Sequence, residues 1–204
     1  MSTRSIYIVD DDDAVRSSLY SLLSALPDQL VRTFASGEAF LERSDELDPG
    51  VVLLDHSMPG LTGMEVLQRL DARRFVAVIL TGHGSVAIAL EAIRSGAADF
   101  LEKPYDPDTL LQILDRAFSN LEQDRAALAK VAAAQAKIER LSAREREVLK
   151  GLIEGRPNKV IAHELEISPR TVEIYRSNVM EKLEVRSLSE ALRIAFAAGL
   201  FPGY

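Results

Sequence analysis

Acidic residues, a hydroxyl and a lysine follow short apolar runs in the first part of this chain. Asp10 and Asp11 come after Ile6–Val9, Asp55 after Val51–Leu54, Thr81 after Phe75–Leu80, and Lys103 shortly after Phe100 and Leu101. Short apolar runs with β-branched residues are typical of buried strands. Carboxylates, a hydroxyl and an ammonium group, if they meet, can bind a divalent cation and a phosphoryl group.

Helical patterns separate these runs, and they decide whether the polar residues can meet. The alternation of strands and helices, with a further strand at residues 30–34, predicts an α/β fold with a doubly wound, five-stranded parallel sheet. Ser85 is expected to begin the helix that follows the fourth strand. Sites in such folds lie at the carboxyl ends of the strands, so we expect these side chains to share one edge of the sheet.

The expected site suits phosphoryl transfer to a carboxylate. Three converging carboxylates repel one another, and a cation relieves that repulsion. Oxygen ligands without His or Cys suit Mg²⁺. Asp55 is then the candidate nucleophile that forms an aspartyl phosphate, Lys103 neutralises charge on the transferred group, and Thr81 hydrogen-bonds a phosphoryl oxygen. Asp12 and Asp13 are interpreted as charges at the N-terminus of the following helix.

Residues 1 to about 120 resemble the receiver domain of a two-component response regulator. The matching segments are Val9–Asp12, Leu54–Gly60, Leu80–Gly84 and Phe100–Tyr105. The resemblance implies that Asp55 is the phospho-acceptor and that a sensor histidine kinase is the partner. It implies a flavodoxin-like fold and Mg²⁺ held by Asp11, Asp55 and the Ser57 main-chain carbonyl, with Asp10 acting through water. It also implies a Thr81–Phe100 switch pair, a phosphoryl-binding Lys103 and a cis peptide between Lys103 and Pro104.

A competing interpretation belongs to a different functional class. The Asp10-x-Asp12 pattern after an apolar strand resembles the nucleophile motif of haloacid-dehalogenase-like phosphohydrolases, in which Asp10 would be the nucleophile. Two features disfavour this alternative: the aspartate at the end of the third strand, and a C-terminal region that is expected to bind DNA. We therefore expect a protein that is not an enzyme, with at most autophosphatase activity.

Residues 121–140 are expected to continue the last receiver helix as a linker. Neither Gly nor Pro interrupts residues 108–141. Apolar residues recur at intervals of four and three from Leu110 to Ile138, with polar breaks at Asp124 and Gln135. Beyond Leu121 two interpretations stay open: a solvated linker, or a coiled coil with a second subunit.

Residues 141–204 are predicted to form a separate helical domain. Ser142 and Glu145 form a capping-box pattern at the first helix, and Ser168-Pro169 is an N-cap followed by proline at the first helical position. A short helix from Asn158, a tight turn and the helix from Pro169 make a helix-turn-helix arrangement. The segments Leu141–Leu149, Asn158–Ala162 and Ser168–Glu173 resemble the LuxR-type helix-turn-helix of FixJ/NarL regulators.

Promoter DNA is the ligand that this resemblance implies. The candidate DNA-contacting residues are Lys159, Arg170, Thr171, Glu173, Tyr175, Arg176, Asn178 and Lys182. Glu173 can accept a hydrogen bond from a cytosine amino group but repels phosphate. RNA polymerase is a further expected partner. We expect a homodimer when the protein is phosphorylated. Two copies are expected to bind DNA together, with Ile194, Ala195 and Ala198 as candidates for the contact between them.

Composition limits the remaining possibilities. The chain of 204 residues contains no cysteine, which excludes disulfides and thiol catalysis. The net charge of −7 is uneven, since residues 141–204 contain ten Lys/Arg and nine Asp/Glu. The segment Met1–Ser5 lacks the apolar core of a signal peptide, and no apolar run approaches the roughly 18 residues of a membrane span. We expect a soluble cytoplasmic protein that does not associate with membranes.

Overall fold

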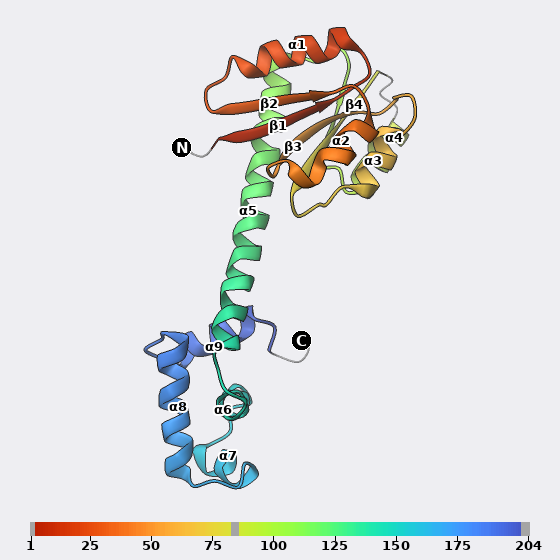
Figure 1. Ribbon diagram of the computed structural model, residues 1–204. Coiled ribbons are helices and arrows are strands. Elements are labelled where there is room, and N and C mark those ends of the chain that lie inside the picture. The colour runs from red at the N-terminus through yellow and green to blue at the C-terminus, as the bar shows by residue number, and fades with distance from the viewer. Residues whose placement is uncertain (1–2, 83–85, 201–204) are drawn as a thin grey trace. The chain divides into compact units, whose positions relative to one another are not determined.

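The structure is a computed structural model that describes residues 3–82 and 86–200 (Figure 1). It divides into two compact units, Met1–Arg125 and Ala126–Tyr204. The predicted helix start at Ser85, and the motif residues His83 and Gly84, lie outside the described residues.

The first unit contains a five-stranded parallel sheet in the order β2-β1-β3-β4-β5. This confirms the predicted fold class. Its strands are β1 (Arg4–Val9), β2 (Gln29–Phe34), β3 (Gly50–Asp55), β4 (Phe75–Thr81) and β5 (Asp99–Glu102). Its helical elements are α1 (Asp13–Ser24), α2 (Gly37–Arg43), the short 3₁₀ helix η1 (Ser44–Glu46), α3 (Gly63–Arg69), α4 (Val86–Arg94) and α5 (Pro107–Glu139), which extends into the second unit.

Helices cover both faces of this sheet. Alternate side chains of β1 point to opposite faces: Ile6 and Ile8 pack with α1 and α5, whereas Tyr7 and Val9 pack with α2, α3 and α4. All six residues of β3 are buried because the strand lies between two neighbours and under helices on both sides. The carboxyl end of β3 therefore emerges at a fixed place in the sheet, with Asp55 beside Leu80 of β4.

The second unit is helical. It contains α6 (Ala143–Ile153), α7 (Asn158–Glu164), α8 (Pro169–Leu183) and α9 (Leu188–Ala197). Both predicted caps are present: Ser142 forms a capping box with Glu145, and the Ser168 side chain accepts a hydrogen bond from Thr171 N. Capping satisfies N–H groups that the first turn of a helix leaves without a partner, and it sets where α6 and α8 begin.

The end of α5 contributes to the core of the second unit. Ile138, on the last turn of α5, is 6% exposed and packs in a cluster with Leu149, Val179 and Leu183. The Lys137 ammonium donates to Leu183 O at 2.9 Å, at the C-terminal end of α8. Lys137 and Arg140 both form ion pairs with Glu184, the C-cap residue that follows α8. The last turn of α5 is therefore built into this unit.

One expectation for α9 is wrong. Ala195 was expected to contact a second copy, but its side chain is fully buried within the unit's own core, where Ile194 and Ala198 also pack. Phe196, on the same helix, is 69% exposed. Sequence spacing did not distinguish the inward face of this short, apolar helix from its outward face.

Candidate functional site

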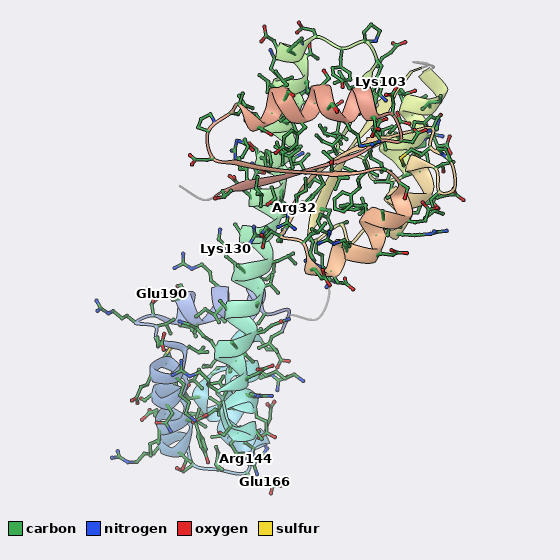
Figure 2. All side chains as sticks on the ribbon, turned by 45° about the horizontal axis from the view of Figure 1, so that its top comes forward. Arg32, Lys103, Lys130, Arg144, Glu166 and Glu190 are labelled. Carbon is green, nitrogen blue, oxygen red and sulfur yellow. The ribbon has the colours of Figure 1, made fainter. Side chains whose placement is uncertain are left out.

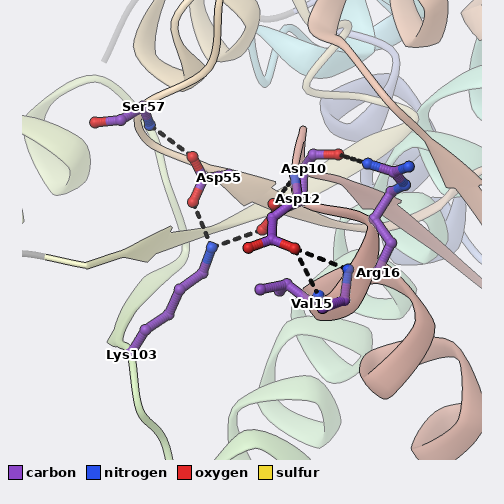
Figure 3. Close-up of polar contacts among 8 residues, drawn as sticks. Asp10, Asp12, Val15, Arg16, Asp55, Ser57 and Lys103 are labelled. Carbon is purple, nitrogen blue, oxygen red and sulfur yellow. Dashed lines mark hydrogen bonds and ion pairs between the residues drawn. The ribbon is translucent and has the colours of Figure 1, made fainter.

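The first half of the site is the turn after β1. The Asp10 side chain is almost fully buried, and its Oδ1 atom accepts a hydrogen bond from Asp12 N at 2.9 Å. Asp12 is the N-cap of α1 and accepts from Ala14 N and Val15 N, as expected for a charge at a helix N-terminus. The Arg16 guanidinium donates to the Asp10 main-chain oxygen at 2.6 Å. The turn is thus held through both the side chain and the main chain of Asp10 (Figure 3).

The second half of the site is the end of β3. The Asp55 side chain is buried, and its Oδ2 atom accepts a hydrogen bond from Ser57 N at 2.8 Å. The next peptide is fixed to β4, because His56 N donates to Leu80 O at 2.7 Å. Asp55 is therefore presented by the most deeply buried strand and oriented by the loop that follows it.

Lys103 joins the two halves. Its Nζ atom lies 2.6 Å from Asp10 Oδ2 and 2.6 Å from Asp55 Oδ1 (Figure 3). Lys103 N donates to Thr81 O at 2.7 Å, which fixes the residue at the end of β5. The Lys103–Pro104 peptide is cis, as the resemblance implied. Residues far apart in the chain thus meet at one edge of the sheet, where Figure 2 labels Lys103.

One ammonium group shared by two buried carboxylates determines the electrostatics of this edge. Burial raises the pKa of Asp55. The hydrogen bond and charge of Lys103 lower it, the charge of Asp10 raises it further, and the pKa stays above its ordinary value. Burial alone would lower the pKa of Lys103, but its two carboxylate partners raise it. The three groups together carry a net negative charge, which favours a further cation.

The remaining predicted residues of this site have different surroundings. Thr81 is buried at the end of β4, and Phe100 on β5 is half-buried against the core under α2, α3 and α4. Ser57 is exposed on the loop after β3, and Asp11 is exposed in the turn after β1. Asp10 and Asp55 therefore meet Lys103, whereas Asp11 does not.

The predicted convergence of three carboxylates is not found. Within residues 3–82 and 86–200, no group of three or more His, Asp or Glu side chains is placed to hold a metal ion. The sequence showed Asp10 and Asp11 together at a strand end, but neighbouring residues point in different directions, and only Asp10 turns inward. Two carboxylates with a net negative charge still fit Mg²⁺, which binds through one or two carboxylates and keeps several waters.

The second unit contains a helix-turn-helix. Glu166 adopts a positive φ of 55° between α7 and α8, and Ile167 N donates to Ala162 O at 3.0 Å, which closes the turn. At the start of α8 the Ser168 and Thr171 hydroxyl groups are hydrogen-bonded, with their oxygen atoms 2.8 Å apart. A cluster of Val148, Leu152, Ile161, Ala162 and Val172 fixes α7 and α8 against α6.

Most of the predicted DNA-contacting residues are at least partly exposed, whereas Tyr175 and Lys182 make contacts within the unit. Lys159, Arg170 and Glu173 are exposed, and Thr171, Arg176 and Asn178 are half-buried. Tyr175 packs against the core shared by α6, α7 and α8. Lys182 forms an ion pair with the buried Glu145 at 2.7 Å. Tyr175 and Lys182 therefore make intramolecular contacts that sequence analysis did not predict.

An apolar residue of α8 is also exposed. Ile174 on α8 is 54% exposed and follows Glu173, which is exposed as well. The DNA-contacting residues predicted from sequence are all polar or charged, so they do not include Ile174. A large aliphatic side chain facing solvent on the second helix of a helix-turn-helix suits contact with a thymine methyl group.

A parallel α/β unit with paired carboxylates and a lysine, followed by a helix-turn-helix, defines the class of two-domain DNA-binding regulators. Residues 6–115 match the family described as response regulator receiver domain. Residues 139–195 match the family described as bacterial regulatory proteins, luxR family. The chain belongs to the response regulators that combine these two domains.

Known relatives cover nearly the full chain. The chain is 45% identical over 197 residues to the transcriptional regulatory protein FixJ of Bradyrhizobium diazoefficiens, covering 96% of each protein. It is 38% identical over 204 residues to FixJ of Rhizobium meliloti, covering 99% of this chain and 100% of the relative.

Solved structures are similar over the same extent. The response regulator StyR matches with a TM-score of 0.84 and 33% identity, covering 96% of this chain and 99% of StyR. Full-length FixJ from B. japonicum matches with a TM-score of 0.58 and 44% identity, and the match covers 98% of this chain and 100% of that FixJ chain.

The protein is thus a DNA-binding response regulator of the FixJ/LuxR type. Its receiver domain implies a sensor kinase as partner, and its LuxR-type domain implies DNA binding. The family is one of regulatory transcription factors, which favours this assignment over the phosphohydrolase alternative. Among the described residues, no helix is both long and apolar enough to cross a membrane.

Proposed function

We propose that Asp55 accepts a phosphoryl group from the phosphohistidine of a partner histidine kinase. An Asp55 carboxylate oxygen forms the new bond to phosphorus, the P–N bond breaks, and the histidine nitrogen retains the bonding electron pair. The observation that supports this most directly is that Lys103 Nζ lies 2.6 Å from both Asp55 Oδ1 and Asp10 Oδ2 at one edge of the sheet. Lys103 orients the acceptor and offsets negative charge on the incoming group.

Mg²⁺ is the proposed cofactor. When bound, it supplies positive charge that stabilises the phosphoryl oxygens during transfer. Asp11, Asp55 and the Ser57 main-chain carbonyl are the proposed ligands, with Asp10 acting through a water molecule. Asp10 is well suited to a fixed role because its carboxylate and its carbonyl oxygen are both hydrogen-bonded. Asp11 is exposed in the same turn and can reorient without leaving a buried core.

Phosphorylation is proposed to act on Thr81 and Phe100. The Thr81 hydroxyl would bind a phosphoryl oxygen, and the half-buried Phe100 ring would then turn inward. The resulting change promotes receiver pairing, dimerisation and binding of promoter DNA, with RNA polymerase as a further partner. A typical ligand coupling of about 1–3 kcal/mol is too small for a complete shift of a two-state equilibrium, so several such effects must combine.

We also propose the functional boundaries of the chain: a receiver domain at residues 1–120, a helical linker at 121–140 and a DNA-binding domain at 141–204. Leu121 is the last residue of α5 in the core formed with α1. Leu128 and Val131, further along α5, are 43% and 39% exposed. Lys130, labelled in Figure 2, is exposed in the same part of the helix. This exposed part is the candidate for pairing with a second subunit.

The proposed acceptor can be tested with purified protein. The protein is incubated with Mg²⁺ and acetyl phosphate or beryllofluoride, and its intact mass and oligomeric state are measured. Asp55→Asn and the exposed control Asp108→Asn are treated in parallel. We expect wild type and Asp108→Asn to form the adduct and shift towards dimer, and Asp55→Asn to do neither. Phosphorylation of Asp55→Asn as efficient as that of wild type would refute the proposal.

A further inference from the structure

Glu38 lies outside the site but contacts the loop that forms one side of it. The residue is in the first turn of α2, and its Oε1 atom accepts a hydrogen bond from Leu61 N at 2.8 Å. Leu61 belongs to residues 56–62, which connect Asp55 to α3. This hydrogen bond joins positions 23 residues apart in sequence and spans from one helix to the acceptor loop.

The conformation of this loop matters for the acceptor in two ways. Ser57 N donates to Asp55 Oδ2 at 2.8 Å, so the loop orients the Asp55 carboxylate. The Ser57 carbonyl is the proposed main-chain ligand for Mg²⁺. A side-chain ligand can find its position by rotation, whereas a main-chain carbonyl points where the backbone places it. Ligand geometry at Ser57 therefore depends on what holds the loop.

Two glycines allow α2 to approach the loop closely. Gly60 has a φ of +77°, and a Cβ atom there would lie 2.4 Å from Glu38 Oε1. A Cβ atom on Gly37 would lie 2.3 Å from Val66 Cγ2 of α3. A side chain at Gly60 would displace the Glu38 carboxylate from Leu61 N, and one at Gly37 would collide with Val66. The two glycines therefore leave the space that the Glu38–Leu61 contact occupies.

The other end of the loop is also fixed. Gly63 N donates to His56 O at 3.1 Å, and Thr62 forms a capping box with Glu65 at the start of α3. Between these two fixed ends, Leu61 N donates to the Glu38 carboxylate of α2. Hydrogen bonds from its own backbone N–H and from Leu61 N lower the pKa of Glu38, so its carboxylate is ionised at neutral pH.

We infer that Glu38 is a positioning residue for the acceptor site: it holds the loop so that the Ser57 main chain has the geometry needed at Asp55. Glu38 does not contact the reacting atoms and acts through Leu61 and the loop backbone. This inference rests on the proposed role of Asp55 as phospho-acceptor and of Mg²⁺ as cofactor.

The first test measures the loop without metal. Amide exchange and the ¹⁵N–¹H shift of Leu61 are followed by NMR in metal-free wild type, Glu38→Ala, Glu38→Gln and the control Glu42→Ala. Glu42 is exposed on the same helix. We expect Leu61 exchange to accelerate about tenfold or more in Glu38→Ala, the equivalent of one lost hydrogen bond to a charged acceptor. Glu38→Gln retains an acceptor oxygen and should keep part of the protection.

The pH dependence of the Leu61 shift identifies the partner. In wild type the shift should follow protonation of the Glu38 carboxyl, below the usual range for glutamate, and this titration should vanish in Glu38→Gln. This titration identifies Glu38 as the group bound to Leu61 N, and the Mg²⁺ dependence of phosphorylation decides whether that bond matters for the site. If Glu38→Ala does not fold, wild type and Glu38→Gln are compared in both measurements, and equal Mg²⁺ dependence of the two would overturn the inference.

The second test measures the consequence for the site. The rate of Asp55 phosphorylation by acetyl phosphate is measured against Mg²⁺ concentration. Glu38→Ala should require about tenfold more Mg²⁺ for its half-maximal rate, the size expected for loss of a residue that orients a ligand. Glu38→Gln should fall between Glu38→Ala and wild type, and Glu42→Ala should match wild type.

The outcomes separate the two proposals. Unchanged Leu61 exchange and unchanged Mg²⁺ dependence in Glu38→Ala would overturn the role of Glu38 while Asp55 phosphorylation in wild type stands. Altered exchange with unchanged Mg²⁺ dependence would also overturn it, since the loop would then move without consequence for the site. Absence of any Asp55 adduct in wild type would instead refute the proposed function.

Discussion

Lys103 Nζ lies 2.6 Å from Asp55 Oδ1 and 2.6 Å from Asp10 Oδ2, so one cation serves two buried carboxylates. The ammonium side chain is 21% exposed, whereas the Asp10 and Asp55 side chains are 1% and 9% exposed. Charges removed from water to this degree are stable only when paired, and here one negative charge is left over. A site of this kind sacrifices folding stability for the capacity to take up positive charge.

Replacing Asp55 with asparagine should therefore stabilise the receiver at neutral pH. The folded-state pKa of Asp55 is raised, so its contribution to stability is present below the ordinary carboxyl pKa and is lost as pH rises through the folded value. At neutral pH the ionised carboxylate is a cost that Asn removes. We expect Asp55→Asn to increase the free energy of unfolding by about 1 kcal/mol near pH 7, a typical size for one buried polar group.

This difference should shrink on acidification, as the wild-type carboxyl takes up its proton. Urea unfolding of both proteins across a pH series is the measurement, and Asp108→Asn serves as control. A destabilised Asp55→Asn at neutral pH would show that the Lys103–Asp55 attraction exceeds the cost of burial.

We expect substitution of Lys182 to weaken DNA binding indirectly, by lowering the stability of the second unit. Burial alone would raise the pKa of Glu145, but hydrogen bonds from Lys182 and Ser142 bring the pKa below its usual value. The stabilisation is therefore present above the ordinary glutamate pKa and is lost as pH falls through the folded value. Lys182→Met should destabilise the second unit at neutral pH by about 1–2 kcal/mol, because the Glu145 carboxylate loses a charged partner.

Salt dependence separates this role from phosphate contact. Each phosphate contact contributes about one to the slope of log affinity against log salt. On a site selected from random duplexes, Arg170→Ala should reduce the slope by about one. Lys182→Met should leave the slope unchanged. A reduced slope with unchanged thermal stability would assign Lys182 to the DNA contacts predicted from sequence.

Ile138→Ala should destabilise the second unit although it lies on α5. Ile138 is 6% exposed and packs with Leu149, Val179 and Leu183. Truncating a buried isoleucine to alanine typically costs about 2–5 kcal/mol. Leu128→Ala is the matched control on the same helix, because Leu128 is 43% exposed. Calorimetry should show a lowered transition only for Ile138→Ala. Equal effects of the two substitutions would contradict the assignment of Ile138 to this core.

Ile174 should determine a preference for thymine. Its 54% exposed side chain beside Glu173 can contact a thymine 5-methyl group in the major groove. Ile174→Ala should weaken binding to a selected site by about 1 kcal/mol, the scale of burying one or two methyl groups. Replacing the contacted thymine with deoxyuridine should cost wild type a similar amount and cost Ile174→Ala little. Additive losses from the two changes would place Ile174 away from that methyl group.

Local physics explains how much could be predicted from sequence. The strands were recognised because buried parallel strands are continuous apolar runs, and α6 and α8 because Ser142 and Ser168 are strong N-caps. The order of the polar residues at the strand ends predicted that Asp55 and Lys103 would lie together, because the carboxyl ends of parallel strands meet at one edge.

Tertiary structure alone decided which neighbours meet. Asp10, not Asp11, turns inward to Lys103; Lys182 pairs with Glu145; and Ala195 is buried while Phe196 is exposed. Each of these choices depends on the direction of a side chain and on a partner distant in sequence. Spacing thus predicted the fold, and the resemblance of the motifs indicated the family and made Asp55 the proposed acceptor. Side-chain pairing was settled by packing, which no local pattern contains.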